Sequence, residues 1–407
     1  MLLKKSLFII SSAVMLAATT SAAIAGPTNH QVIAPTCLIS AAKFSFKTLS
    51  NQQGVSLIEV NDAGIQQLAE AKHHTKPACG GFMDVSRAWE SKQALRKQTP
   101  ATFLAGHLSA SKKSLTADKP TYQIKHEKQV TALIETITPA NMWENLTTLT
   151  SFKDRYADSN NGVKAADWIK AKIESIAKET GHNDVTVYTV STGSRYKQPS
   201  VVAKFGNSDK PGIVIGGHID TLSSTWEDKP GADDDGSGSV TLMETARTIL
   251  ASGMQFEKPI YFIWYSAEEM GLVGSDHVVA YFQDKNIPVE AALQLDMTGY
   301  AYKNEPTMWL INDFVSKDLT KFMETLINTY VKQPVKYSKC GYACSDHASW
   351  NQAGIPAAFP FESEMGHDDP YIHTANDKMD VLSLSHMTDY AKLATSYAVE
   401  MAVPVSK

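Results

Sequence analysis

The sequence predicts an α/β fold in which a mostly parallel central sheet is flanked by helices. From about residue 119 onward, amphipathic helical patterns alternate with short apolar runs bounded by glycine or proline, a pattern typical of parallel sheets. Polar residues follow these runs, at the strand ends where such sheets bind ligands. With 43% hydrophobic and 20% charged residues, the 407-residue chain can build a sizeable core.

The expected elements follow one another in chain order. Apolar residues at helical spacing predict helices at 162–178 and 239–251. The strand at 213–215 opens after Pro211-Gly212 and leads into Gly216-Gly217-His218. Further apolar runs predict strands at 185–190, 200–205, 260–265, 291–295 and 308–311.

The N-terminus has the pattern of a secretory signal peptide over residues 1–25. Lys4 and Lys5 precede a short apolar stretch at 7–18, and small residues end in Ala23-Ile24-Ala25. The stretch is shorter than a membrane-spanning helix needs, so we expect export and not a membrane anchor. The protein should therefore be secreted to the extracellular space.

Residues 26–118 are expected to form a small α+β propeptide, and 119–407 the main domain. A strand at 55–60 and a helix at 65–72 are the clearest elements of the first part. The polar stretch 91–119 lacks periodicity and predicts an exposed linker at its C-terminal end, open to a processing protease. A permanent accessory domain is the alternative.

Charge and cysteine content narrow the class of protein. The 38 Lys and Arg nearly balance the 43 Asp and Glu, so the net charge of -5 excludes a nucleic-acid partner held by bulk charge. No later segment could span a membrane, and nothing demands more than a monomer. Four cysteines suit an oxidising compartment, and their placement at 37 and 79 and at 340 and 344 suggests two local bridges among three possible connectivities.

Acidic residues and histidines collect at the predicted strand ends. Carboxylates packed this closely repel one another unless cations lie between them. Two histidines and three carboxylates are a donor set suited to zinc, with one carboxylate able to bridge two ions. The acidic residues and histidines from which such a set could come are His218, Asp220, Asp233, Asp234, Asp235, Glu268, Glu269, Asp296 and His373.

Two of these motifs suggest a division of tasks. Glu268 and Glu269 follow a buried-looking apolar run and point in different directions, so one can bind metal while the other remains a free base. Asp220 stands two residues after His218, where its carboxylate can accept the second ring N–H of a ligating histidine.

From about Tyr122 onward, the chain resembles the bacterial zinc aminopeptidases of the M28 clan, closest to the secreted Vibrio-type leucyl aminopeptidase. This resemblance implies the zinc-peptidase fold and a metallo-aminopeptidase that hydrolyses the first residue of peptides with a free N-terminus. The matching motifs are Gly217-His218-Ile-Asp220, residues 230–238, Ala267-Glu268-Glu269-Met-Gly-Leu, Gln294-Leu-Asp296-Met, residues 340–350, Pro360-Phe-Glu-Ser363 and Ile372-His373-Thr374.

The resemblance implies a cofactor of two Zn²⁺ per chain. Asp234 would bridge the ions, with His218 and Asp296 completing one site and Glu269 and His373 the other. Cobalt or manganese could occupy the same ligands.

The same resemblance implies roles beside the metal. Glu268 would be the general base and acid, Tyr342 a stabiliser of the tetrahedral intermediate, and Asp220 the partner of the first histidine ligand. The peptide bond between Asp234 and Asp235 would be cis, as it is in the family.

The substrate pocket is also implied by the resemblance. A disulfide between Cys340 and Cys344 would lie beside it, and an apolar lining would favour Leu and other large hydrophobic residues. Asp368, which stands where the family has an aromatic residue, leaves N-terminal Lys or Arg as the alternative preference. The expected apolar lining is Met297, Phe359, Phe361, Met365 and Ile372.

Two other functions fit the same scaffold. A glutaminyl cyclotransferase would bind a single zinc ion, and a non-catalytic binding ectodomain would have lost ligands. The full ligand set favours the aminopeptidase over both. The Asp346-His347 pair is expected to be structural, because no Gly-x-Ser-x-Gly elbow accompanies it.

Overall fold

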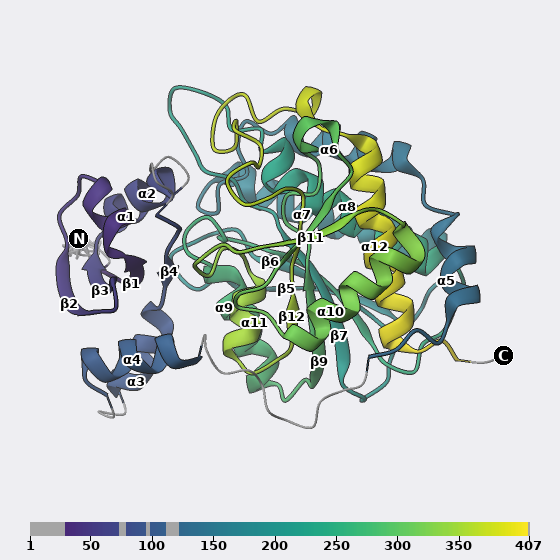
Figure 1. The fold of residues 1–407 in the computed structure, drawn as a ribbon, viewed down its shortest axis with the longest axis horizontal. Coiled ribbons are helices and arrows are strands. Elements are labelled where there is room, and N and C mark those ends of the chain that lie inside the picture. Colours follow the sequence, from purple (N-terminus) through teal and green to yellow (C-terminus); the bar gives the residue numbers. More distant parts are fainter. Residues whose placement is uncertain (1–28, 73–78, 95–97, 111–121, 406–407) are drawn as a thin grey trace, which may run out of the picture.

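The computed structural model describes residues 29–72, 79–94, 98–110 and 122–405, which form an N-terminal region (29–110) and a larger C-terminal region (122–405) (Figure 1). The expected signal peptide lies outside the described residues, as do residues 95–97 and 111–121, which include part of the linker expected at 91–119. Within these ranges, no helix combines the length and apolar character needed to cross a membrane.

The N-terminal region is built on an antiparallel sheet with the order β2-β3-β1-β4. Gln53 and Gly54 turn the β2–β3 hairpin with φ angles of 54° and 77°, as a tight two-residue turn requires. Asn61 accepts the N–H of Gly64 at 3.0 Å and fixes the start of α2. The elements are β1 (His30–Pro35), α1 (Thr36–Ala41), β2 (Lys47–Gln52), β3 (Val55–Val60), α2 (Asp62–Ala71), β4 (Met83–Asp84), α3 (Ser86–Ala94) and α4 (Pro100–Ala110).

The expectation of an exposed linker from residue 91 is wrong for much of its length. Helix α3 runs to Ala94, and α4 occupies 100–110. Phe103 and Leu104 are buried, and the Phe103 ring meets Trp89 edge-on at 5.2 Å. The apolar residues Phe103, Leu104 and Leu108 are too few for a sustained helical period over 91–119, so packing against the sheet orders this helix.

The central sheet of the C-terminal region has the order β12-β9-β7-β8-β6-β5. The first four strands run parallel, whereas β8, β6 and β5 pair antiparallel, so the expected mostly parallel sheet is in fact mixed. Residues 191–199 connect β5 to β6 without a crossover helix, which permits antiparallel pairing. The strands are β5 (Val185–Val190), β6 (Ser200–Phe205), β7 (Gly212–His218), β8 (Ile260–Tyr265), β9 (Val289–Gln294) and β12 (Ala357–Ala358).

Helices cover both faces of this sheet (Figure 1). Ile213 and Ile215 of β7 pack toward the larger helical layer, and Val214 between them packs toward the smaller one. Burial on both faces explains the continuous apolar runs of the sequence. The larger layer is α5 (Glu127–Ile134), α6 (Pro139–Thr150), α7 (Asn160–Glu179), α8 (Gly238–Ala251), α10 (Lys317–Leu326) and α12 (Leu384–Ala402); the smaller is α9 (Val273–Asp284) and α11 (His347–Gln352).

A second sheet has the order β11-β10-β13. It consists of β10 (Met308–Ile311), β11 (Val335–Ser338) and β13 (Pro360–Phe361), so the strand expected at 308–311 exists but lies outside the central sheet. Ile311 and Phe361 from this sheet pack with Met297, which follows β9. Shorter helical turns span Ala232–Ser237, Tyr302–Asn304, Ile327–Val331 and Met379–Val381.

Two apolar clusters join the N-terminal to the C-terminal region. In the first, Leu38 and Leu68 pack in one cluster with Met270. In the second, Leu57 packs in one cluster with Leu272. Residues of the C-terminal region therefore complete the core of the N-terminal region.

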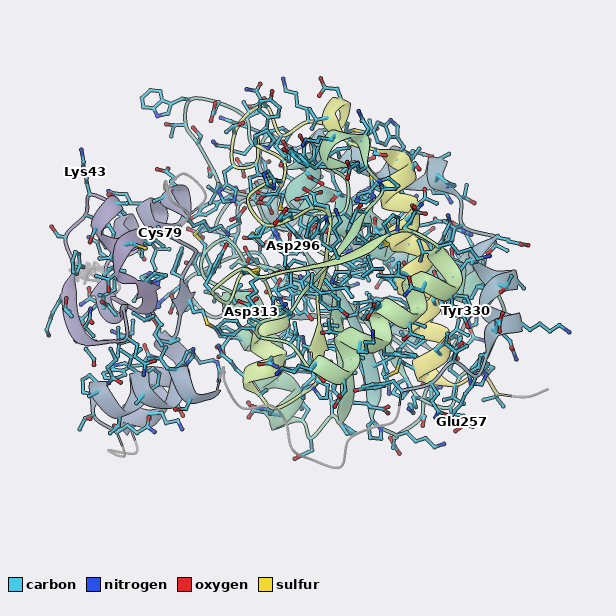
Figure 2. The ribbon with its side chains drawn as sticks, in the orientation of Figure 1. Lys43, Cys79, Glu257, Asp296, Asp313 and Tyr330 are labelled. Carbon is cyan, nitrogen blue, oxygen red and sulfur yellow. A yellow bond between two sulfur atoms is a disulfide. The ribbon has the colours of Figure 1, made fainter. Side chains whose placement is uncertain are left out.

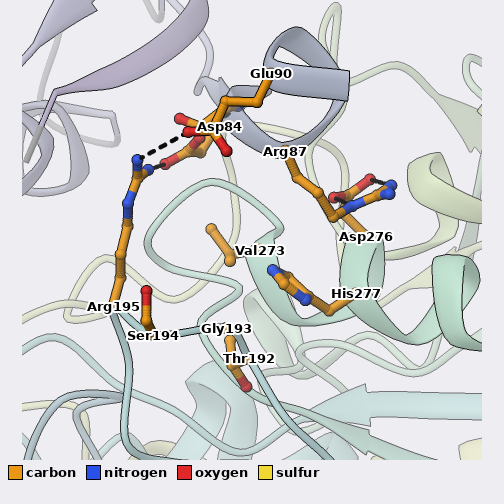
Figure 3. Close-up of a pocket in the computed structure, with 11 residues that line it drawn as sticks. Asp84, Arg87, Glu90, Thr192, Gly193, Ser194, Arg195, Val273, Asp276 and His277 are labelled. Atoms are coloured by element: carbon orange, nitrogen blue, oxygen red, sulfur yellow. Dashed lines mark hydrogen bonds and ion pairs between the residues drawn. The ribbon is translucent and has the colours of Figure 1, made fainter. Parts of the chain in front are cut away.

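Charged pairs line a pocket at the rim of this contact (Figure 3). The Arg87 guanidinium donates to both carboxylate oxygens of Asp276, at 2.5 and 2.6 Å. Arg195 lies 3.6 Å from Asp84 and 3.7 Å from Glu90. These pairs fix the orientation of the docked region more than its affinity, because exposed ion pairs are weak.

Candidate metal centre

The carboxyl ends of the central strands bring the expected ligands together. β7 ends at His218, Glu269 follows β8, and Asp296 follows β9. Asp234 lies in the turn that leads into α8, and His373 lies in the loop before α12. All five are buried, and Asp296 lies inside the C-terminal region (Figure 2).

The five residues form two groups of three that share Asp234. The first triad is His218, Asp234 and Asp296, the second triad is Asp234, Glu269 and His373, and the ligand atoms within each lie within 4.8 Å of one another. Nε2 of His218 lies 3.0 Å from Oδ1 of Asp234, and Nε2 of His373 lies 3.0 Å from Oδ2. The two oxygens of one carboxylate thus face different triads, as a bridging ligand requires.

The donor chemistry of both triads fits zinc. Each offers one imidazole nitrogen and two carboxylate oxygens, which are common zinc ligands. Three protein ligands leave a position open for water or substrate, the arrangement of a catalytic rather than a structural site.

The charges within the centre favour ionised carboxylates. Burial raises the pKa of Glu269, but the positive charges of His373 and Lys72 outweigh burial and lower this pKa to about 2. Burial also raises the pKa of Asp234, yet hydrogen bonds from His218 and His373 hold it well below its usual range. The His373 pKa is lowered by burial but raised by Glu269 and Asp234, to about 9.

A small cavity beside the two triads is lined in part by Asp234 and Asp296. Glu268 also lines this cavity but belongs to neither triad. Burial raises its pKa well above the usual value, although Lys72 opposes this. Of the two adjacent glutamates, Glu268 is therefore the one that binds a proton more readily, as a group that exchanges protons with substrate must. The N–H groups of Glu268 and Glu269 both donate to the Asp220 carboxylate, at 3.0 and 3.2 Å, so Asp220 orients both glutamates.

Asp220 and Asp235 support the centre in ways the sequence indicated only in part. Nδ1 of His218 lies 3.1 Å from the carbonyl oxygen of Asp220 and 3.6 Å from its carboxylate, so the backbone makes the closer contact. Asp235 accepts the N–H groups of His218 at 2.9 Å and Met297 at 3.1 Å, which ties two strand ends together. The Asp234–Asp235 peptide bond is cis, as the resemblance implies.

Two further supporting residues gave no signal in the sequence. Asp377 accepts the N–H of Asp234 at 3.2 Å. Arg155 is 1% exposed and donates to the carbonyl oxygens of Ile219 and Gly231, at 2.7 and 2.8 Å. Neither stands in a recognisable motif, so only the fold places them beside the ligands.

A disulfide joins Cys340 to Cys344, as the resemblance implies. The loop between the two cysteines brings Tyr342 to the cavity. Burial raises the pKa of the Tyr342 hydroxyl above its usual value, so the hydroxyl keeps its proton and remains a hydrogen-bond donor. Ser345, which follows Cys344, donates a hydrogen bond to the Asp296 carboxylate at 2.5 Å.

The second expected bridge is not formed. No disulfide joins Cys37 to Cys79. The sulfur of Cys37 lies 3.9 Å from the carbonyl oxygen of Cys79, so the two cysteines are neighbours without being bonded.

Most of the residues expected to form the substrate pocket line the cavity. Asp368 lies among the lining residues. The free volume is about 20 Å³, which holds roughly one water molecule. Met297, Phe359, Phe361, Met365 and Cys344 line it, and Ile372 and Cys340 pack in the same apolar cluster.

The N-terminal region contributes a residue to the lining of this cavity, Lys72, which follows α2. Its Nζ lies 3.2 Å from Oε2 of Glu268 and 2.8 Å from Oε2 of Glu269. The side chain is 9% exposed, and lysine is rarely so buried unless it is paired. The sequence placed Lys72 at the end of an expected helix and gave no sign of this contact.

Gly80 and Gly81 pack against the ring of Tyr342, which lines the cavity. A Cβ on Gly80 would meet the Tyr342 ring at 2.5 Å, and one on Gly81 would meet it at 2.7 Å. Only glycine lets this segment lie so close to the ring.

Comparison with known proteins finds a peptidase family and individual peptidases that are similar to this chain. The model of peptidase family M28 matches residues 200–398. Leucine aminopeptidase 1 of Fusarium vanettenii is 36% identical over 339 residues, which cover 80% of this chain and 86% of that protein.

Two solved structures from Legionella pneumophila are similar over nearly the whole chain. The LapA aminopeptidase has 43% identity and a TM-score of 0.85, covering 94% of this chain and 100% of that one. LapB has 37% identity and a TM-score of 0.81, covering 92% and 100%. Coverage this high means that the similarity extends into the N-terminal region.

Proposed function

The chain belongs to peptidase family M28 and is a metallo-aminopeptidase; from that premise we propose that it is a secreted di-zinc enzyme made as a precursor. One observation carries the proposal: the two carboxylate oxygens of the buried Asp234 face different triads, one oxygen for each. A pair of cations uses a carboxylate in this way, whereas a single ion does not. The finer likeness to the bacterial Vibrio-type leucyl enzymes is part of the same proposal.

The two triads would hold the two zinc ions. His218 and Asp296 complete one site, Glu269 and His373 the other, and Asp234 serves both. When bound, the ions polarise the scissile carbonyl and make a bound water more acidic.

Glu268 and Tyr342 carry the remaining chemistry. The Glu268 carboxylate takes a proton from the attacking water and then returns it to the leaving amine. The Tyr342 hydroxyl donates a hydrogen bond to the oxygen of the tetrahedral carbon. The acidic cavity also attracts the free α-amino group of a peptide, which confines cleavage to the first residue.

The pocket favours large hydrophobic residues such as Leu at the substrate N-terminus. Its lining is mostly apolar, and two similar proteins are named leucine aminopeptidases. The Asp368 carboxylate accepts the N–H of Gly366 at 2.9 Å, and burial raises its pKa, so it is a weak partner for a substrate cation. Preference for N-terminal Lys or Arg is the alternative.

The N-terminal region acts as an inhibitory propeptide within residues 26–118, between a signal peptide over 1–25 and a catalytic domain over 119–407. A cavity of about 20 Å³ closed by Lys72 has no room for a leucine side chain. Release of this region after cleavage by a processing protease therefore precedes catalysis. The secreted enzyme would act as a monomer.

The decisive experiment compares leucyl-anilide with N-acetyl-leucyl-anilide, using protein freed of its N-terminal region and supplied with zinc. We expect hydrolysis of the free-amine compound alone, and faster hydrolysis of leucyl- than of lysyl-anilide. Cleavage of neither compound would contradict the proposal and favour the glutaminyl cyclotransferase. Zinc content separates the two, because the cyclotransferase binds one ion per chain.

A further inference from the structure

One ligand atom of the second triad is already in contact with a cation of the protein itself. Oε2 of Glu269 lies 3.0 Å from Nε2 of His373, so this oxygen points into the second triad. The same oxygen lies 2.8 Å from Nζ of Lys72. The ammonium group of Lys72 thus lies in direct contact with an oxygen that a metal ion in this triad would bind.

An ammonium group at this oxygen opposes the binding of a zinc ion to the same atom. Zinc binds a carboxylate oxygen at about 2.0–2.2 Å, and the ammonium group has no lone pair with which to join the coordination. Both are cations, and their repulsion is strong because Lys72 and Glu269 are 9% and 1% exposed and little water screens them.

The structure holds Lys72 in place by more than its ion pairs. Ile65 and Leu68 of α2 lie in the cluster that includes Met270 of the C-terminal region. Gln66 of the same helix donates to the Tyr156 hydroxyl. The docked helix therefore delivers Lys72 to a defined position.

The contact is one-sided between the two triads. Across the described ranges, the ion pairs of Lys72 are with Glu268 and Glu269, and none is with Asp296, the carboxylate that belongs to the first triad alone. The Lys72 charge also acts on the shared Asp234, without an ion pair within 4 Å. The second triad is therefore the one that Lys72 contacts directly.

We propose that Lys72 stands in for one of the two metal ions, so that the precursor binds zinc in the first triad and excludes it from the second. Loss of the N-terminal region then converts a one-zinc protein into a two-zinc enzyme. This inference rests on the proposed di-zinc function and goes beyond simple obstruction of the pocket, since it predicts a change in metal stoichiometry.

The test is zinc binding by the full precursor, whose intact N-terminal region is verified by mass spectrometry. Metal-free precursor, its Lys72→Met and Lys72→Arg variants, and the processed enzyme are titrated with zinc in a calorimeter, and bound zinc is counted after dialysis. Methionine keeps the length of the side chain without its charge, whereas arginine keeps a charge. We expect about one tightly bound zinc in the wild-type and Lys72→Arg precursors and two in the others.

The second zinc should bind at least about 100-fold more weakly to the wild-type precursor than to the processed enzyme, given one opposing charge within 4 Å in a buried site. Two equally tight ions in the wild-type precursor would overturn the inference while leaving the di-zinc function intact. If the processed enzyme itself binds one ion or none, the proposed function fails instead. Should Lys72→Met not fold, the wild-type precursor and processed enzyme still decide the matter.

Discussion

The N-terminal and C-terminal regions differ in where their cores come from. Both main clusters of the C-terminal region consist entirely of described residues between 130 and 402. Both clusters of the N-terminal region include residues from the other region, among them Tyr196, Leu222 and Ala343. The larger region is thus self-contained in its packing, whereas the smaller one completes its core only when docked. Chemistry and stability should therefore reside in the C-terminal region alone.

The strongest test of that division is Glu268→Gln in the processed enzyme. Removing the group that moves the proton should lower kcat about 10²- to 10⁴-fold, while thermal unfolding and zinc content stay unchanged. Hydrolysis of leucyl-anilide measures the loss. Glu305→Gln, an exposed glutamate outside the site, is the matched control and should be silent. A loss of less than 10-fold would remove Glu268 from the mechanism.

A matched pair of leucine truncations separates the two cores. Leu293 of β9 and Leu38 of α1 are 1% and 0% exposed, and each Leu→Ala change should cost about 2–5 kcal/mol in its own region. In calorimetry, Leu293→Ala should lower the unfolding midpoint of the processed enzyme. Leu38→Ala should instead loosen the N-terminal region and raise the activity of the precursor. If Leu38→Ala also lowered the midpoint of the catalytic transition, the C-terminal core would not be independent.

Acid should destabilise both regions through a buried histidine, and it should loosen the N-terminal region first because that region completes its core only when docked. Burial lowers the pKa of His107 in α4 to about 4 and that of His347 in α11 to about 3. Each folded region then binds fewer protons than its unfolded chain, whose histidines titrate near 6.5. For both histidines the stabilisation is complete above pH 6.5 and decreases together as the pH falls, and the loss ends near pH 4 for His107 and near pH 3 for His347.

Hydrogen exchange between pH 7 and pH 4 measures this order. Amides of β1 and β3 should lose protection at higher pH than those of β7 and β9. His107→Gln should weaken the pH dependence of the first pair of strands and leave the second unchanged. Simultaneous loss of protection in all four strands would mean that the regions unfold as one unit.

The smallest effect is expected at the charged rim of the contact (Figure 3). Arg87 and Asp276 pair at the surface, with side chains 40% and 30% exposed, so Arg87→Ala should weaken docking by about 1 kcal/mol or less, roughly 5-fold. Inhibition of the processed enzyme by the separate N-terminal region measures this change. Lys47→Ala, at an exposed position of β2, is the control. A loss above 100-fold would show that charge rather than apolar packing holds the regions together.

The sequence was most informative where local pattern and final environment agree. The strands expected at 55–60, 185–190, 200–205 and 260–265 have those bounds in the structure, because apolar runs end at glycine, proline or polar residues. The candidate ligands were identifiable for a similar reason. His218, Glu269 and Asp296 each lie at or just beyond the end of a strand, where the pattern changes abruptly from apolar to polar.

Features that depend on distant contacts were not predictable. The antiparallel edge formed by β5 and β6 follows from strand pairing, which apolar runs alone do not specify. Asp377 is 143 positions from the Asp234 N–H that it accepts, and Lys72 is 196 positions from Glu268. Such pairs exist only after the whole chain has packed, so no window of sequence contains them.

The shared clusters also bear on the order in which the molecule is made. The N-terminal region leaves the ribosome first, yet Tyr196, Leu222 and Met270, which complete its core, are synthesised long afterwards. Until then its apolar residues have no partner surface, and its native state is out of reach. The first region to be synthesised is therefore the last to be finished, and it cannot serve as a preformed template for the domain that follows.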